Sequence, residues 1–176
     1  MVTDDRGTRG VDRRPEERPD RREEESAEPD DQGALRAGLV GGLFGTVVMT
    51  VFREPVARSL PPTAAFIAKF TGGRPGDHPV GALALHLLYG TAAGGVFGGL
   101  VGASDDERVA AELGASEETV GLVAGTAYAL ALSAFGERVL LGRLLDMDLE
   151  DDELMIFHAG HVVYGVALGA WVGSRS

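Results

Sequence analysis

The feature that most constrains this chain is a stripe of glycines at every fourth residue, which occurs twice in long apolar stretches. Each stripe begins at a histidine, and the positions are His86, Gly90, Gly94, Gly98 and Gly102, and then His161, Gly165, Gly169 and Gly173. A glycine inside a water-soluble helix costs roughly 1 kcal/mol relative to alanine. In a bilayer, however, rows of small residues let two helix backbones pack closely. The stripes therefore predict helix packing inside a membrane.

Four apolar stretches are each close to the ~20 residues that a helix needs to cross a bilayer. They cover residues 34–52, 80–103, 119–141 and 154–172. The sequence therefore predicts an all-α fold, an integral membrane four-helix bundle formed by residues 33–176. A further apolar piece at 63–70 is too short to span and is expected to lie in the interface or to re-enter. The acidic connection at 104–118 is expected to hold one short surface helix.

Residues 1–32 have a different composition, with seven arginines, twelve acidic residues and almost no strongly apolar side chains. Such a segment cannot bury a core, so we expect a disordered acidic tail. Its mixed charges argue against a nucleic-acid-binding arm, which would need a basic excess. The whole sequence has no cysteine, which excludes disulfides, thiolate metal sites and thiol nucleophiles.

The sequence also indicates an internal duplication. A shift of 83 residues aligns Gly38, Gly42 and Glu54 with the residues Gly121, Gly125 and Glu137. A shift of 75 residues aligns the first histidine-glycine stripe with the second, together with the tyrosines Tyr89 and Tyr164. Each unit contains two helices, so the second unit starts on the same side as the first. We therefore expect two parallel-repeat hairpins related by a pseudo-two-fold axis along the membrane normal.

Topology follows from the number of spans and the distribution of basic residues. Four spans place both termini on one side, and that side has ten basic residues against six on the other. The excess predicts cytoplasmic termini of a multi-pass protein in the cell membrane.

Five ionisable side chains are expected in the same half of the bilayer, near the ends of the first and third spans and the starts of the second and fourth. They are Glu54, His86, Glu137, His158 and His161. Ionisable groups in membrane spans are costly and often functional. Together they could handle protons, because histidine titrates near neutral pH, or cations. They could instead bind a divalent metal as bundle sites do.

A structural role is the third alternative for these five residues. Each histidine would then hydrogen-bond across a helix pair, and the glutamates would pair with Arg53 and Arg138. The hydroxyls of Thr46, Thr50, Thr126 and Ser133 are expected to bond to helix carbonyls. No phosphate-binding loop, nucleophile elbow or zinc-protease motif is present in the sequence. No cofactor is therefore indicated.

Two segments carry a family resemblance. They are GLVGGLFGTVVMT at 38–50 and HVVYGVALG at 161–169. The chain resembles small four-span membrane proteins of unknown function that are widespread in haloarchaea, and it is more distantly similar to the YagU-like inner-membrane family. The resemblance covers residues 34–173 and implies topology alone. A strongly acidic composition with fifteen arginines and one lysine is consistent with a salt-adapted source.

The preferred functional interpretation is a non-enzymatic membrane protein, a structural module or a subunit that packs through its glycine stripes, with the lipid bilayer as its partner. The alternative is a small proton or cation transporter or channel that uses the five-residue cluster. A single bundle of four helices leaves little room for a pore between its own helices, so this alternative would favour a homo-oligomer. A membrane enzyme with a Glu/His metal centre is the third possibility.

Overall fold

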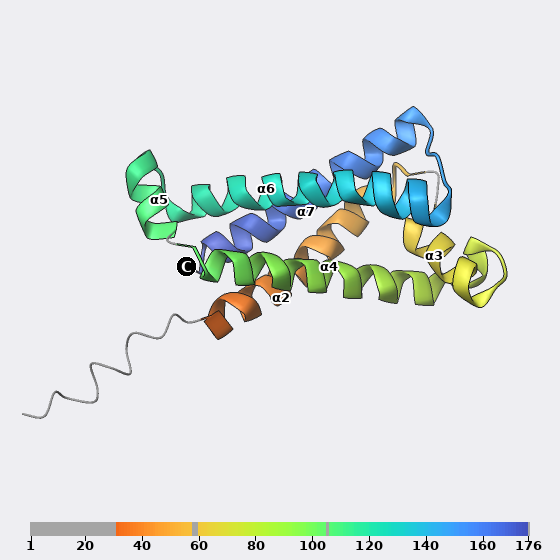
Figure 1. Cartoon of the computed structure of the whole chain (residues 1–176), viewed down its shortest axis with the longest axis horizontal. Coiled ribbons are helices and arrows are strands. Elements are labelled where there is room, and N and C mark those ends of the chain that lie inside the picture. Colours follow the sequence, from red (N-terminus) through yellow and green to blue (C-terminus); the bar gives the residue numbers. More distant parts are fainter. Residues whose placement is uncertain (1–30, 58–59, 105, 176) are drawn as a thin grey trace, which may run out of the picture.

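The computed structural model describes residues 31–57, 60–104 and 106–175, and the regular structure in these ranges is entirely helical. The predicted tail at 1–32 therefore lies outside the described residues, apart from its last two positions. Four long helices run along the long axis of the molecule (Figure 1). They are α2 (Asp31–Arg53), α4 (Pro79–Gly102), α6 (Glu117–Phe135) and α7 (Asp151–Gly173). Each overlaps one of the expected spans.

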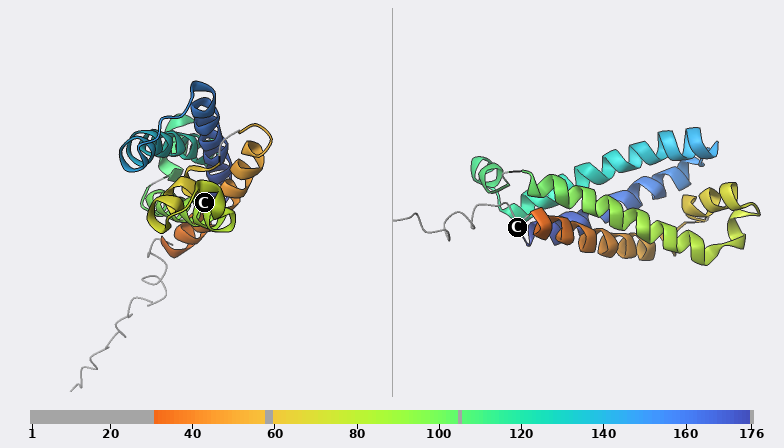
Figure 2. Two further views of the ribbon diagram at one scale, coloured as in Figure 1. Left: turned by 90° about the vertical axis from the view of Figure 1, so that its right-hand side faces the viewer. Right: turned by 60° about the horizontal axis from the view of Figure 1, so that its bottom comes forward.

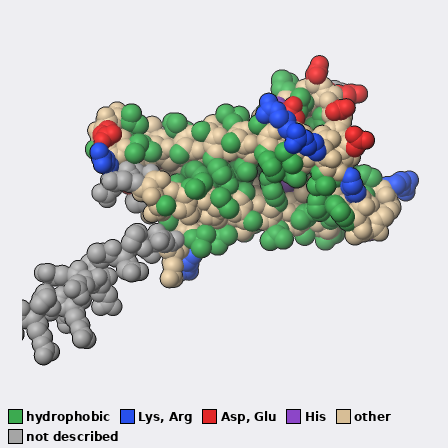
Figure 3. All heavy atoms as spheres, in the orientation of Figure 1, with side chains coloured by type: hydrophobic (Ala, Val, Ile, Leu, Met, Phe, Trp, Pro, Cys, Tyr) green, Lys and Arg blue, Asp and Glu red, His purple; other side chains and the backbone are tan. Residues whose placement is uncertain are grey.

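These helices agree with the membrane prediction. The described part of the chain has four helices long and apolar enough to cross a bilayer, and the third candidate span continues past α6 to Leu145. Charged side chains gather mostly toward the two ends of the long axis, whereas the middle shows mainly apolar side chains and backbone (Figure 3). Length and surface together are those of a multi-pass membrane protein.

Four short elements connect the long helices. They are α3 (Pro62–Thr71), the 3-10 turn η1 (Pro75–Asp77), α5 (Asp106–Leu113) and the π-helical segment η2 (Gly136–Leu145). The helices α3 and α5 lie at opposite ends of the bundle (Figure 2). The expected short surface helix within 104–118 is α5. The apolar piece at 63–70 is a helix that packs against α4, η1 and η2.

Alternate long helices run in opposite directions, so the described start of α2 and the end of α7 lie at the same end of the molecule (Figure 1). We call the other end, where α2 and α6 finish and α4 and α7 begin, the cavity end. Packing is closest within two helix pairs, α2 with α4 and α6 with α7. A further extensive contact between α2 and α7 joins the two hairpins.

Within each hairpin, the glycines bring the two backbones into direct contact. A Cβ atom placed on Gly42 would lie 2.5 Å from the carbonyl oxygen of Gly90 and 2.8 Å from Cα of Gly94. A Cβ atom placed on Gly125 would lie 2.6 Å from the carbonyl oxygen of Gly165 and 2.7 Å from Cα of Gly169. Neither site has room for a side chain, so glycine is required by the close approach of the helices.

The remaining stripe residues differ in their surroundings. The nearest atoms to a Cβ on Gly98 would be those of Ala34 and Gly38, and a Cβ on Gly173 would lie 3.0 Å from the carbonyl oxygen of Glu117. Gly102 is the last residue of α4 and is half-buried.

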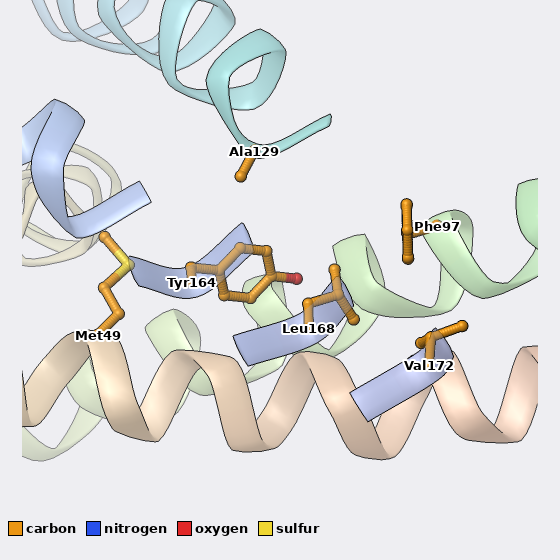
Figure 4. Close-up of a cluster of buried hydrophobic side chains, with 6 residues drawn as sticks. All are labelled: Met49, Phe97, Ala129, Tyr164, Leu168 and Val172. Atoms are coloured by element: carbon orange, nitrogen blue, oxygen red, sulfur yellow. The ribbon is translucent and has the colours of Figure 1, made fainter. Parts of the chain in front are cut away.

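Side chains from all four long helices meet in the middle of the bundle. The buried cluster contains Met49, Phe97, Ala129, Tyr164, Leu168 and Val172 (Figure 4). Three of the six come from α7, and Leu168 is fully buried. The helix α7 therefore supplies half of this cluster, and it packs against both α6 and α2.

Candidate functional site

A cavity of about 190 Å³ lies between the helices at the cavity end of the bundle. Its walls come from α2, α3, α4, α7 and the junction of α6 with η2, and most of the lining side chains are apolar. The polar lining residues are Thr46, Arg53, Thr63, His86, Tyr89, His161 and Tyr164. For scale, an engineered apolar cavity of about 150 Å³ holds benzene. The space is therefore large enough for one ring or a short chain.

Arg53 is the only Lys or Arg side chain among the lining residues that the structure describes. It is the last residue of α2, where a cation is favoured by the helix dipole. The aliphatic part of its side chain lies against α7 at Gly160, where a Cβ atom added to the glycine would be 3.3 Å from Cδ of Arg53. The side chain is only 7% exposed, and its Nε is buried without a hydrogen-bond partner. A buried guanidinium with an unsatisfied donor is costly and requires an explanation.

Two histidines share this cavity. His161 on α7 is buried, and its Nδ1 lies 2.8 Å from the carbonyl oxygen of Phe157. Because a carbonyl only accepts, Nδ1–H donates this bond, and Nε2 of the neutral ring is left as an acceptor. His86 enters from α4, is half-buried, and lies close enough to Arg53 and His161 for electrostatic interaction.

Tyr164 fixes the inner wall of the cavity. Its hydroxyl donates to the carbonyl oxygen of Gly90 across 2.8 Å, which ties α7 to α4. Tyr89, which the predicted repeat aligns with Tyr164, is 37% exposed. The aligned tyrosines therefore differ in burial.

The threonine hydroxyls bond as expected. Thr46, Thr50 and Thr126 each donate to the carbonyl oxygen four residues earlier in the helix. Ser133 is different, since its Oγ lies 2.6 Å from Nδ1 of His158 on α7. The serine therefore joins two helices instead of bonding to its own.

Glu137 and His158 form a separate pair beside the cavity. Their Oε2 and Nε2 atoms are 3.5 Å apart, and each side chain is 36% exposed. Neither residue lines the cavity. The expected pairing of the glutamates with Arg53 and Arg138 is not found among the described ion pairs, since the partner of Glu137 is a histidine.

The five candidate residues therefore divide into three groups. His86 and His161 face one cavity, Glu137 pairs with His158, and Glu54 is exposed just beyond α2. A protein metal site needs three or four ligands at coordination distance. In the described ranges no three His, Asp or Glu side chains are close enough together to hold a metal ion. The arrangement does not favour the metal-centre hypothesis.

Three components of the site were not foreseen. Arg53 was expected only as a partner for glutamate, although a charge at the end of an apolar span was a usable signal. The second unforeseen component is the helix α3, which lines the cavity with Pro62, Thr63 and Phe66. This helix is also joined to η2, because Lys69 Nζ donates to the carbonyl oxygen of Leu144.

The third unforeseen component is the π-helical segment η2, which lines the cavity with Gly136, Leu140 and Leu145. The π-helix is rare in proteins. Here the wider helix begins at the point where α6 reaches the cavity.

Comparison with known proteins identifies no relative. No protein-family profile matches the chain, and no match is found among curated proteins or among solved structures. The family resemblance described above therefore remains an expectation, and function has to be argued from the site.

Proposed function

We propose that this chain is a non-enzymatic multi-pass membrane protein that binds a small molecule in the cavity described above. The observation that supports this most directly is the cavity itself, whose apolar walls surround a few polar groups. Concave, mostly apolar sites with a few convergent polar side chains are typical of small-molecule binding.

We further propose that the frame of this site consists of two repeated hairpins. The equivalent glycine contacts support the repeat: Gly42 meets Gly90 and Gly94 in one hairpin, while Gly125 meets Gly165 and Gly169 in the other. These pairs match at the same shifts of 83 and 75 residues that align the sequence. A duplicated unit explains why two hairpins of different composition make backbone contacts at equivalent glycine positions.

The glycine stripes support an internal frame better than a docking surface. The tightest contacts of Gly94, Gly98, Gly165 and Gly169 are to the partner helix of their own hairpin. A subunit that assembled through these stripes would have to separate the hairpins first. The stripes are therefore a means of holding the cavity walls in place.

The alternative of a proton or cation pathway has less support. A cation entering the cavity would meet the Arg53 guanidinium, which opposes its binding. The two glutamates that were expected to attract a cation, Glu54 and Glu137, are not part of the lining. Catalysis also lacks support, because no buried nucleophile and base are paired at the cavity among the described hydrogen bonds.

The proposal can be tested by direct binding to the full chain in lipid nanodiscs. Benzamide, a neutral ring of suitable size, is the first probe, and saturable binding is measured by ligand-observed NMR. Ala93 lines the cavity and is buried, so A93F should fill the space. Ala92 is exposed on the same helix, so A92F adds the same bulk outside the cavity.

We expect saturable binding to the natural chain and to A92F, and its loss in A93F. Equal binding to both variants would place the probe outside the cavity. Absence of saturable binding of both benzamide and the anionic probe introduced below would overturn the proposed function.

A further inference from the structure

We infer that the cavity selects a small organic monoanion, a carboxylate or phosphate group on a compact apolar body, and that Arg53 and Thr63 bind its charged group. This inference rests on the proposed function, because it names the class of ligand for the same cavity. It is carried by the charge, the unsatisfied donors and the size of the site.

The described residues of the lining carry a positive charge. Among the described lining residues, Arg53 is the only one that is charged irrespective of local pH, and none of them is acidic. A guanidinium matches the geometry of carboxylate and phosphate oxygens, and it keeps its charge when desolvated better than an ammonium does. An anion at this position would compensate a buried charge that the protein itself compensates incompletely.

The distribution of unsatisfied polar atoms points to the same place. Three buried side-chain atoms in the described residues have no hydrogen-bond partner: Arg53 Nε, Thr63 Oγ1 and Trp171 Nε1. The first two belong to residues of the cavity lining, on α2 and α3. Buried donors are normally satisfied by protein, water or ligand. The two unsatisfied groups at one cavity are therefore the polar atoms that the charged group of a bound ligand would satisfy.

The acidic residue that acts electrostatically on Arg53 does not replace such a ligand. Glu153, buried in the first turn of α7, acts electrostatically on Arg53. No ion pair joins the two within 4.0 Å, both residues being in the described part of the chain. His86 and His161 also lie close to Arg53 and add hydrogen-bonding capacity without negative charge. The guanidinium thus remains available to an incoming anion.

The apolar walls determine the rest of the ligand. Phe66, Leu85, Leu132 and Leu140 line the space around the polar groups. The volume of about 190 Å³ is somewhat larger than that of a benzene-binding cavity. Aromatic or short branched monoanions fit this size, whereas inorganic phosphate would leave the walls without a contact.

Benzoate and benzamide form the decisive pair of probes, because they have the same shape and differ in charge. Binding of each is measured on the full chain in neutral-lipid nanodiscs, for the natural sequence and for R53Q, T63V and R36Q. Arg36 is exposed on the same helix α2 and serves as the matched control. Circular dichroism and gel filtration check that each variant is folded.

We expect benzoate to bind at least about tenfold more tightly than benzamide, in line with a charge-assisted hydrogen bond. R53Q should abolish this preference while benzamide binding is unchanged, T63V should weaken benzoate binding several-fold, and R36Q should behave as the natural chain. If R53Q does not fold, R53K and T63V test the same contacts, and R53K should keep part of the preference.

Equal binding of benzoate and benzamide would overturn the inference and leave the proposed function standing. Failure of both probes to bind would overturn the proposed function and the inference with it. A second arm uses nanodiscs that contain an anionic lipid. Competition between that lipid and benzoate would identify a lipid headgroup as the natural source of the anion, and absence of competition would indicate a soluble one.

Discussion

The most direct test of the frame is a pair of glycine-to-alanine substitutions on α4, G94A and G99A. A Cβ on Gly94 would lie 2.7 Å from the backbone nitrogen of Gly42 and still closer to Gly38. A Cβ on Gly99 would have no neighbour within 4 Å. Both changes add one methyl group to the same helix, so helix propensity changes equally and the difference between them isolates packing.

The expected magnitude follows from the geometry. Carbon atoms normally approach to about 3.5–4.0 Å, so α2 and α4 must separate by roughly 1 Å to admit the methyl group. Overpacking of this kind typically costs about 1–3 kcal/mol. Because roughly 1.4 kcal/mol is a factor of ten, G94A should shift the unfolding equilibrium about 5- to 150-fold relative to G99A.

The measurement is reversible unfolding in mixed micelles, followed by far-ultraviolet circular dichroism as the fraction of denaturing detergent rises. G169A provides the equivalent change in the second hairpin, where the methyl group would meet the backbone of Gly121 and Leu122. If G94A proves as stable as G99A, the close approach of the two backbones is not what stabilises the hairpin. If G169A alone is neutral, the two hairpins do not depend on their glycines in the same way.

Three further predictions follow from individual contacts. Y164F should lower the free energy of unfolding by about 0.5–1.5 kcal/mol, because the buried hydrogen bond to Gly90 is lost. Y89F, at an exposed position, should leave the free energy of unfolding unchanged. Equal effects of the two substitutions in the same micelle assay would contradict this prediction. G160V should displace the Arg53 stem and weaken benzoate binding several-fold while benzamide binding persists; unchanged benzoate affinity in nanodiscs would refute the described path of that side chain. K69M removes the contact from α3 to η2, so amide hydrogen exchange in α3 should become faster, with α5 as the internal control; an unchanged exchange rate would show that this contact does not hold α3 in place.

The membrane helices could be predicted from the sequence because length and apolarity alone define a span. The placement of Glu54, His86, Glu137, His158 and His161 near one end followed from the same counting, since successive spans run in opposite directions. Depth along a helix is given by residue number through the fixed rise per residue. These predictions therefore needed no tertiary information.

The grouping of those residues could not be predicted, because it depends on how each helix is rotated about its axis. His158 and His161 are three positions apart on α7, yet only His161 lines the cavity, while His158 contacts Ser133 and Glu137. The π-helical segment was also not predicted, because its first residues belong to the apolar stretch at 119–141 that was expected to form one continuous helix. The rotation of α7 about its own axis, and not the composition of the helix, places His161 in the cavity lining and His158 outside it.

The packing of α7 against both α6 and α2 has a consequence for the order in which the protein is assembled. This helix leaves the ribosome after α2, α4 and α6, yet it supplies Gly160, against which the Arg53 side chain lies, and half of the buried cluster. Until α7 inserts, the hairpin of α2 and α4 would present a guanidinium toward lipid, which is a costly state. A chain stopped before residue 151 would therefore lack the helix surface that covers this charge. The charge of Arg53 is therefore covered only when α7 has packed and the fold is complete.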